Sequence, residues 1–245
     1  MTVLEFAGLV LAGYGAGLIG FVAGMASLVS FPALLAAGLT PVAANATNTV
    51  ALVAVGIGST VRSGEELAGR GRELRTWIIV FAIGGGLGCA LLLLSPPSSF
   101  DAAVPFLVAL AGLALLLQPR LQRLHSSVHH ERMTAIAMFL VAVYGGYFGA
   151  GAGVMFLALL LAARDESMHA ASVLKSFLLG VANLTAAIAF CIFGPVHWWA
   201  SLAVAIGAFL GGWTGPPVVK ALPQDKLRIA IGIGAFGLAA WLFFR

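Results

Sequence analysis

The chain has 245 residues, of which 61% are hydrophobic and only 9% are charged, with a net charge of +4. Soluble domains carry ~25% charged residues, so this composition excludes an ordinary globular protein and indicates an integral membrane protein. The apolar segments are continuous rather than alternating, which predicts membrane helices and not a β-barrel. The basic residues lie in short loops, where they report topology, so the net charge does not indicate a nucleic-acid partner.

The first apolar stretch, Leu4 to Leu39, is too long for a single membrane span. As one helix it would measure ~54 Å, whereas the hydrocarbon core is ~30 Å thick. Glycines, serines and a proline between Gly20 and Pro32 offer a place for a break, because proline removes a backbone hydrogen bond. We therefore expect this stretch to form a broken or re-entrant unit.

Three further spans complete the first half of the chain. They are predicted at Val42–Val61, Trp77–Leu94 and Ala102–Leu117. The segment Arg62 to Arg75 is predicted to be a charged loop, and Pro119 to Arg132 is a polar loop that marks the boundary between the halves.

The second half begins with another interrupted unit, because Gly145 to Gly153 breaks the apolar run from Met133 to Ala163. Each flank is too short to span a membrane that needs ~20 helical residues. Irregular backbone at that depth is tolerated where protein buries it or where it lines a cavity. The break is therefore either a binding site made of half-helix ends or a glycine-rich packing face between helices. The spans that follow are Ala170–Phe193, Trp199–Val219 and Leu227–Phe244.

The two halves resemble each other, since a shift of 125 residues places Gly24 on Gly149. Each half is then a broken unit followed by three spans. We expect a single all-α polytopic membrane domain of about eight helical units, with one repeat at about residues 4–118 and a second at about residues 133–244.

Positive charges indicate how the repeats are oriented. If each broken unit crosses the membrane once, eight Lys and Arg residues lie on one side and four on the other. If each is a re-entrant hairpin, eleven lie on one side and Arg245 alone lies opposite, which obeys the positive-inside rule better. Three full spans per half then invert the second repeat and place both termini outside the cytoplasm. Inverted repeats with broken helices that meet at the midplane are a recurrent plan of transporters.

Lys175 is the only charged residue well inside a predicted span. An intramembrane charge is costly and usually faces a pore or a partner. Beside glycine-rich half-helix ends, Lys175 indicates an anion site, and the alternative is that it snorkels to the membrane interface. Asn183 lies eight residues later, close to the same helix face. It either lines the same path or hydrogen-bonds a neighbouring helix.

Polar residues also cluster at the start of the second predicted span, in the sequence AANATN. Their amide and hydroxyl donors suit a small oxyanion, and the alternatives are helix capping or hydrogen bonding between helices. Together with the breaks and Lys175, they define the candidate substrate-binding residues. These are Ser27, Ser30, Pro32, Asn45, Thr47, Asn48, Gly149, Gly151, Gly153, Ser172, Lys175 and Asn183.

Signatures of catalysis and of cofactor binding are missing from the sequence. The GAGAG stretch lacks the strand and acidic residue that accompany a dinucleotide-binding loop, and no zinc motif or nucleophile arrangement occurs. His129 and His130 are interpreted as a solvated loop pair, and Cys89 and Cys191 as small buried hydrophobes. We therefore expect no enzyme activity, no cofactor and no metal site.

Several motifs resemble the sulfite exporter TauE/SafE family of bacterial and plant membrane proteins. They are GFVAG at Gly20–Gly24, ANATN after Pro41, YGGYFGAGAG at Tyr144–Gly153 and FGPVHW at Phe193–Trp198. The resemblance covers nearly the whole chain. It implies a multi-pass secondary transporter or exporter in the bacterial inner membrane that moves a small sulfur-containing anion, such as sulfite or a sulfonate.

One departure from the family pattern concerns the first break. Many members have a motif like GxGGG where this chain has Gly24 to Leu28, followed by Ser30. The site would then bind through the Ser27 and Ser30 hydroxyls, which puts the family's substrate in doubt for this chain. An anion channel and a non-transporting membrane assembly protein are the alternative functions. The expected partners are a small anion and the lipid bilayer, with homo-oligomerisation left open.

Overall fold

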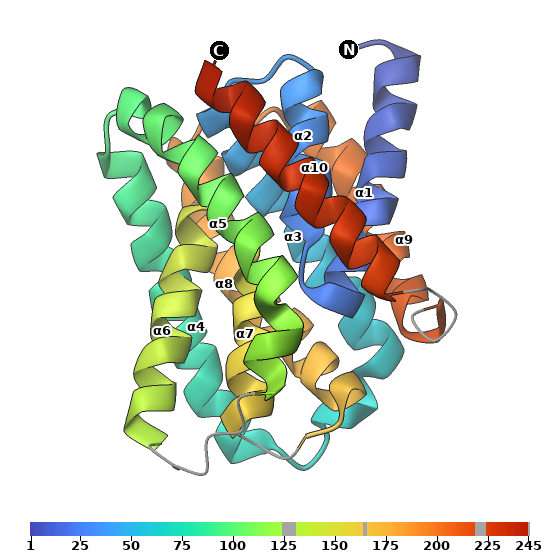
Figure 1. The fold of residues 1–245 in the computed structure, drawn as a ribbon, viewed down its shortest axis with the longest axis vertical. Coiled ribbons are helices and arrows are strands. Elements are labelled where there is room, and N and C mark those ends of the chain that lie inside the picture. The colour runs from blue at the N-terminus through green and yellow to red at the C-terminus, as the bar shows by residue number, and fades with distance from the viewer. Residues whose placement is uncertain (124–130, 164–165, 219–223, 245) are drawn as a thin grey trace.

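The computed structural model describes residues 1–123, 131–163, 166–218 and 224–244, which form ten α-helices and one 3₁₀-helix and no strand (Figure 1). The elements of the first half are α1 (Val3–Ala23), α2 (Ala26–Ala36), α3 (Pro41–Ser63), η1 (Gly64–Leu67), α4 (Gly71–Leu94) and α5 (Pro97–Arg123). Those of the second half are α6 (Glu131–Tyr147), α7 (Ala152–Ala163), α8 (Met168–Phe193), α9 (Trp198–Val218) and α10 (Gln224–Phe244).

The helices confirm a polytopic membrane protein. Within the described residues, α1, α3, α4, α5 and α8 are each long and apolar enough to cross a membrane. Two polar loops are shorter than predicted. Helix α4 already begins at Gly71, inside the expected loop Arg62 to Arg75. The negative charge of Glu73 in its first turn stabilises this helix start, because the N-terminal end of a helix dipole is positive. Helix α5 continues to Arg123, so it includes the start of the expected loop at Pro119.

The first break lies at Gly24 and Met25, within the predicted interval. Gly24 has a φ of 75°, a left-handed conformation that glycine adopts without the steric cost of a Cβ atom, and its N–H bonds the Gly20 carbonyl. Pro32 does not break the chain, because it lies inside α2. A proline there removes only a single backbone donor from a short helix, so α2 continues to Ala36.

The second break, between α6 and α7, lies inside the predicted Gly145–Gly153 stretch. The N–H groups of Phe148 and Gly149 both bond the carbonyl of Tyr144, which ends α6. Gly149 and Gly151 have left-handed φ values of 78° and 79°. The shift that aligns the two halves therefore pairs Gly24 and Gly149 in the same unusual backbone conformation.

The two broken units are hairpins that enter from opposite ends of the molecule (Figure 1). Helix α1 runs inward from the end that carries both termini, and α2 returns toward that end. Helix α6 runs inward from the other end, and α7 returns to it. The hairpin helix α1 packs along α9, and α6 packs along α4, while α3 and α8 contact each other between them.

Small residues permit this close packing. A Cβ atom at Gly13 of α1 would lie 2.3 Å from the Val204 carbonyl oxygen of α9. A Cβ atom at Gly146 of α6 would lie 2.1 Å from the Gly85 carbonyl oxygen of α4. Each hairpin is therefore held backbone to backbone against a helix of the other half, as small residues allow in membrane bundles.

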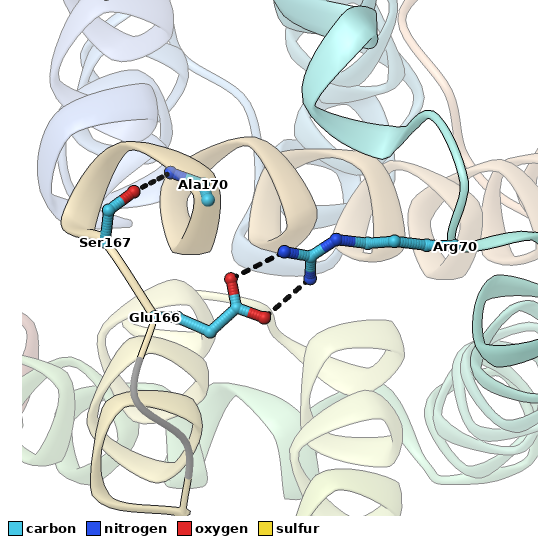
Figure 2. Close-up of polar contacts among 4 residues, drawn as sticks. All are labelled: Arg70, Glu166, Ser167 and Ala170. Atoms are coloured by element: carbon cyan, nitrogen blue, oxygen red, sulfur yellow. Dashed lines mark hydrogen bonds and ion pairs between the residues drawn. The ribbon is translucent and has the colours of Figure 1, made fainter.

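An ion pair joins the halves at the start of α8 (Figure 2). Arg70 donates two hydrogen bonds, of 2.6 and 2.8 Å, to the Glu166 carboxylate. The next residue, Ser167, caps α8 by accepting a 3.1 Å bond from the Ala170 N–H. The pair raises the pKa of Arg70, chiefly through its hydrogen bond to Glu166. The loop charge alone indicates only a role in membrane topology for Arg70. The structure shows that Arg70 also binds Glu166 of the second half.

Candidate functional site

The turns of the two hairpins meet inside the bundle. A Cβ atom added at Gly24 would lie 2.3 Å from the carbonyl carbon of Gly153, and one added at Gly153 would lie 2.5 Å from the Gly24 Cα atom. Neither position has room for a side chain. Glycine is required here because the backbones of the two breaks touch.

A cavity lies beside this contact, with about 570 Å³ of space free of atoms, including its open mouth. Its walls come from α1, α2 and α3 of the first half and from α6, α7 and α8 of the second. Backbone is exposed to it at Gly24, Gly149 and Gly153. The polar side chains in the lining are Ser27, Asn48, Thr49, Lys175, Ser176 and Asn183.

Lys175 is buried in this wall, with only 1% of its surface exposed. Its Nζ atom donates to the carbonyl oxygens of Gly20 and Phe21, at 2.6 Å each, and lies 5.9 Å from the Phe21 ring centre. The alternative in which Lys175 snorkels to the interface is therefore wrong. An ammonium has three donors, so one remains for a ligand in the cavity after two cap the end of α1. The positive charge also lies at the negative C-terminal end of the α1 dipole, and this attraction stabilises the helix end.

Asn48 is held in one orientation by both of its amide atoms. Its Nδ2 donates to Ser27 Oγ at 3.1 Å, and its Oδ1 accepts from the Ser30 hydroxyl. Ser27 and Asn48 reach the cavity, whereas Ser30 lies behind them and is fully buried. The network fixes α2 against α3 and leaves the Ser27 hydroxyl proton for a further acceptor.

Asn183 is half-buried in the cavity wall and has no hydrogen-bond partner among the described residues. Of the predicted residues with an amide side chain, it is the one that lines the cavity without a hydrogen bond to another described residue. It lies two turns from Lys175 on α8, so one helix face presents an ammonium and an amide to the same space.

Asn45 does not line the cavity and instead caps the second hairpin. It is fully buried, and its Nδ2 donates to the Tyr147 carbonyl oxygen at 2.9 Å. Its Oδ1 atom has no partner among the described residues.

The remaining predicted residues lie away from the cavity. Thr47 accepts a 3.0 Å bond from the His197 N–H, and the Ser172 carbonyl accepts from Ser176. Gly151 packs near Ala111, and Pro32 lies within α2. The predicted loop pair His129 and His130 lies outside the described residues.

Two polar cavity residues, Thr49 and Ser176, were not among the predictions. Each lies four residues after a predicted one, Asn45 or Ser172, and each donates to the carbonyl of that residue. Because Asn45 and Ser172 lie away from the cavity, this i,i+4 spacing would not have identified them. Each missed residue directly follows a predicted residue that does line the cavity, Asn48 or Lys175.

The family profile for the sulfite exporter TauE/SafE matches residues 9–242. The chain belongs to the TauE/SafE family. This membership confirms the resemblance that the glycine motifs indicate. The matched residues include both hairpin turns and the residues that line the cavity.

Curated relatives of this TauE/SafE protein are named as probable membrane transporters. One from Sinorhizobium sp is 30% identical over 94% of this chain and 89% of its own length. The YfcA protein of Escherichia coli strain K12 is 26% identical over 94% of this chain and 86% of its own. One from Haemophilus influenzae is 23% identical over 95% and 92%, respectively. No solved structure matches the chain at a significant level.

Membership in the TauE/SafE family and the names of these relatives confirm a multi-pass bacterial membrane protein of a transporter class. A transporter implies a small-molecule substrate and a lipid environment. The cavity between the hairpins brings together polar groups of both halves.

Proposed function

We propose that the protein is a secondary transporter that binds a small sulfur-containing anion, such as sulfite or a sulfonate, in the cavity between the hairpins. The observation that carries the proposal is the lining of this cavity. The Lys175 ammonium and the free Asn183 amide face the same space as the Ser27 hydroxyl. These groups donate hydrogen bonds and supply positive charge, which an oxyanion requires.

Backbone geometry supports an anion as the ligand. Helices α2 and α7 begin at the cavity, with Ala26, Ser27, Ala152 and Gly153 in its lining. The first N–H groups of a helix have no partner within it, and the helix dipole favours negative charge there. The ends of α1 and α6 bring the opposite polarity. The Lys175 ammonium bonds the Gly20 and Phe21 carbonyls at the end of α1, and the Asn45 amide bonds the Tyr147 carbonyl at the end of α6.

The arrangement of the helices supports alternating access. The hairpins enter from opposite ends, and the packing of α1 on α9 mirrors that of α6 on α4. We infer that residues 4–118 and 133–244 are inverted repeats, with the cavity at their interface and both termini outside the cytoplasm. Rocking of one repeat against the other would expose the cavity to each side in turn. On this proposal the protein carries out no chemical reaction on its substrate and needs no cofactor.

Purified protein tests the proposal through a panel of small anions, including sulfite, methanesulfonate, taurine, sulfate and chloride. A bound anion should raise the unfolding temperature in a saturable way, and uptake into proteoliposomes should saturate at similar concentrations. Flux that rises linearly with anion concentration supports a channel instead. No stabilisation and no flux with any anion would favour a non-transporting assembly protein.

The variant Asn183→Leu gives the sharper test. It removes an amide that lines the cavity, and it leaves the hairpin caps intact because these are made by Lys175 and Asn45. A hydrogen bond to a charged group contributes about 1.5–3 kcal/mol, so anion affinity should fall about 10- to 100-fold. Thr185→Val is the matched control, because the Thr185 hydroxyl on the same helix bonds only the Val181 carbonyl. Equal affinity in both variants would remove Asn183 from the site.

A further inference from the structure

The inward end of α6 carries carbonyl groups that the helix does not satisfy. The N–H groups of Phe148 and Gly149 both bond the Tyr144 carbonyl. The carbonyls of Gly145 and Gly146 therefore receive no backbone donor from the described residues. Such an end bears a partial negative charge of about half an electron.

The side chain that bonds the last carbonyl of α6, that of Tyr147, has an amide oxygen without a partner among the described residues. Asn45 is fully buried, its Nδ2 lies 2.9 Å from the Tyr147 carbonyl oxygen, and its Oδ1 bonds nothing among the described residues. The two heavy atoms of a primary amide are about 2.2 Å apart, so Oδ1 lies within roughly 5 Å of the Tyr147 oxygen. A cation ~2.4 Å from each of two oxygens bridges them when they are no more than ~4.8 Å apart, a separation inside this bound.

The other hairpin shows what such an end can hold. At the end of α1, the Lys175 ammonium lies 2.6 Å from two carbonyl oxygens. At the end of α6, the side chain that bonds the last carbonyl, that of Tyr147, is the neutral amide of Asn45. The end of the first hairpin is thus neutralised by the positive side chain of Lys175. The end of the second hairpin has an unpartnered buried oxygen, and the side chain that caps it carries no positive charge.

We propose that a monovalent cation such as Na⁺ binds at the end of α6, between Asn45 Oδ1 and the Tyr147 carbonyl oxygen. Helices α3 and α7 contain no acidic residue, and α6 has only Glu131 at its outer end. Divalent cations generally need carboxylate ligands, so neutral oxygens favour a monovalent ion. The same lack of charge predicts weak binding, in the millimolar range.

The cation site is linked to the cavity through α3. Thr49, which lines the cavity, donates a 2.9 Å hydrogen bond to the backbone carbonyl of Asn45. A cation that orders this turn would favour the arrangement of Thr49 and Asn48 that faces the anion, and each ligand would then raise the affinity for the other equally. This coupling role rests on the proposed transport function, whereas cation binding itself does not.

The test is thermal unfolding of the purified full-length protein in NaCl, KCl and choline chloride at constant ionic strength and without other anions. At about ten times the dissociation constant, Na⁺ should raise the midpoint by about 3–6 °C relative to choline. Asn45→Ala should abolish the difference. Asn45→Asp, which places a carboxylate at the site, should shift the midpoint of the Na⁺ titration at least tenfold toward lower concentration.

Ser59→Ala is the matched control, since Ser59 is equally buried on α3 and its hydroxyl bonds only the Gly56 carbonyl. It should respond to Na⁺ as the unaltered protein does. If Asn45→Ala does not fold, Asn45→Asp still decides the matter. Equal midpoints in all three salts, as expected if a water molecule occupies the site, would overturn the proposal, as would an unchanged Na⁺ response in both Asn45 variants.

The outcome is separable from that of the anion panel. Stabilisation by Na⁺ with no response to any anion leaves the cation site standing and removes the proposed substrate. Saturable anion transport without any Na⁺ response removes the cation site and leaves the transport function intact. If both respond, anion affinity measured with and without Na⁺ gives the coupling directly.

Discussion

The two hairpins have the same shape but differ in how their inward ends are stabilised. The first turns at Gly24 and ends on the buried ammonium of Lys175. The second turns over the wider Phe148–Gly151 stretch and ends on the neutral amide of Asn45. The two hairpins therefore share left-handed glycines at their turns, while the charge at their inward ends differs. The difference shows that hairpins of the same shape need not favour the same ligand. The local charge is set by one side chain at each hairpin end, Lys175 or Asn45.

The largest effect is expected where the two hairpins touch. Gly24→Ala should destabilise the protein by about 2–5 kcal/mol, because the new Cβ would collide with the Gly153 backbone and alanine disfavours a left-handed φ. Chemical unfolding in detergent measures the loss. Gly8→Ala on the same helix is the control, since nothing lies within 4 Å of its Cβ position, and it should be neutral or slightly stabilising. Equal stability of the two variants would mean that the hairpin contact is not as close as the structure has it.

Replacement of the side chain that caps each hairpin tests directly whether charge stabilises the first hairpin more than the second. Lys175→Met should cost about 2–4 kcal/mol, because two buried carbonyls lose charged donors. Asn45→Ala at the other hairpin should cost only about 1 kcal/mol, since it removes a single neutral hydrogen bond and also an unpartnered oxygen. Both values come from unfolding curves of the same preparation. The reverse order would show that the charge of Lys175 is not what stabilises the first hairpin.

On the proposed function, Lys175→Met should also reduce transport, and its loss of stability must be separated from this effect. Flux should be abolished in protein that remains folded and expressed. Asn183→Leu separates the two effects, because this side chain lines the cavity without capping a helix. Full flux in folded Lys175→Met protein would remove the ammonium from the mechanism.

The smallest effect is expected at the ion pair between the halves. A double-mutant cycle of Arg70→Ala and Glu166→Gln should give a coupling of about 0.5–1.5 kcal/mol, because the pair is bidentate but its side chains remain 25% and 12% exposed. The raised pKa of Arg70 means that this guanidinium loses its charge only above its ordinary range. Its contribution is present at lower pH and is lost only in strong alkali, so the coupling should not change between pH 7 and 9. A coupling near zero would show that the pair does not hold the halves together.

Much of this fold is readable from local sequence. Continuous apolar runs predicted the spanning helices, and the glycines of the second break placed it correctly, because no other local signal competes there. The first break could only be assigned to an interval. Glycine, serine and proline all occur between Gly20 and Pro32, and local propensity does not reveal that Pro32 is tolerated within α2.

The partners of the site residues were not readable in the same way. Lys175 was found as an intramembrane charge, but its acceptors lie 155 and 154 residues earlier in the chain. Asn45 and Asn48 look equivalent in sequence, yet one caps α6 while the other joins the Ser27 network. The Arg70–Glu166 pair spans 96 residues and was missed. Such assignments depend on how helices of the two halves pack, which periodicity within each helix does not encode.

The separation between Lys175 and its acceptors has a consequence for biosynthesis. The carbonyls of Gly20 and Phe21 leave the ribosome long before the lysine that will cover them. The Gly24 N–H can bond the Gly20 carbonyl at once, but until Lys175 arrives water, lipid headgroups or the insertion machinery must satisfy the Phe21 carbonyl. We therefore expect the early hairpin not to reach its mature depth in the bilayer unaided. The N-terminal half is thus expected to be a poor folding unit when expressed alone, and to become protease-resistant only when its missing half is supplied.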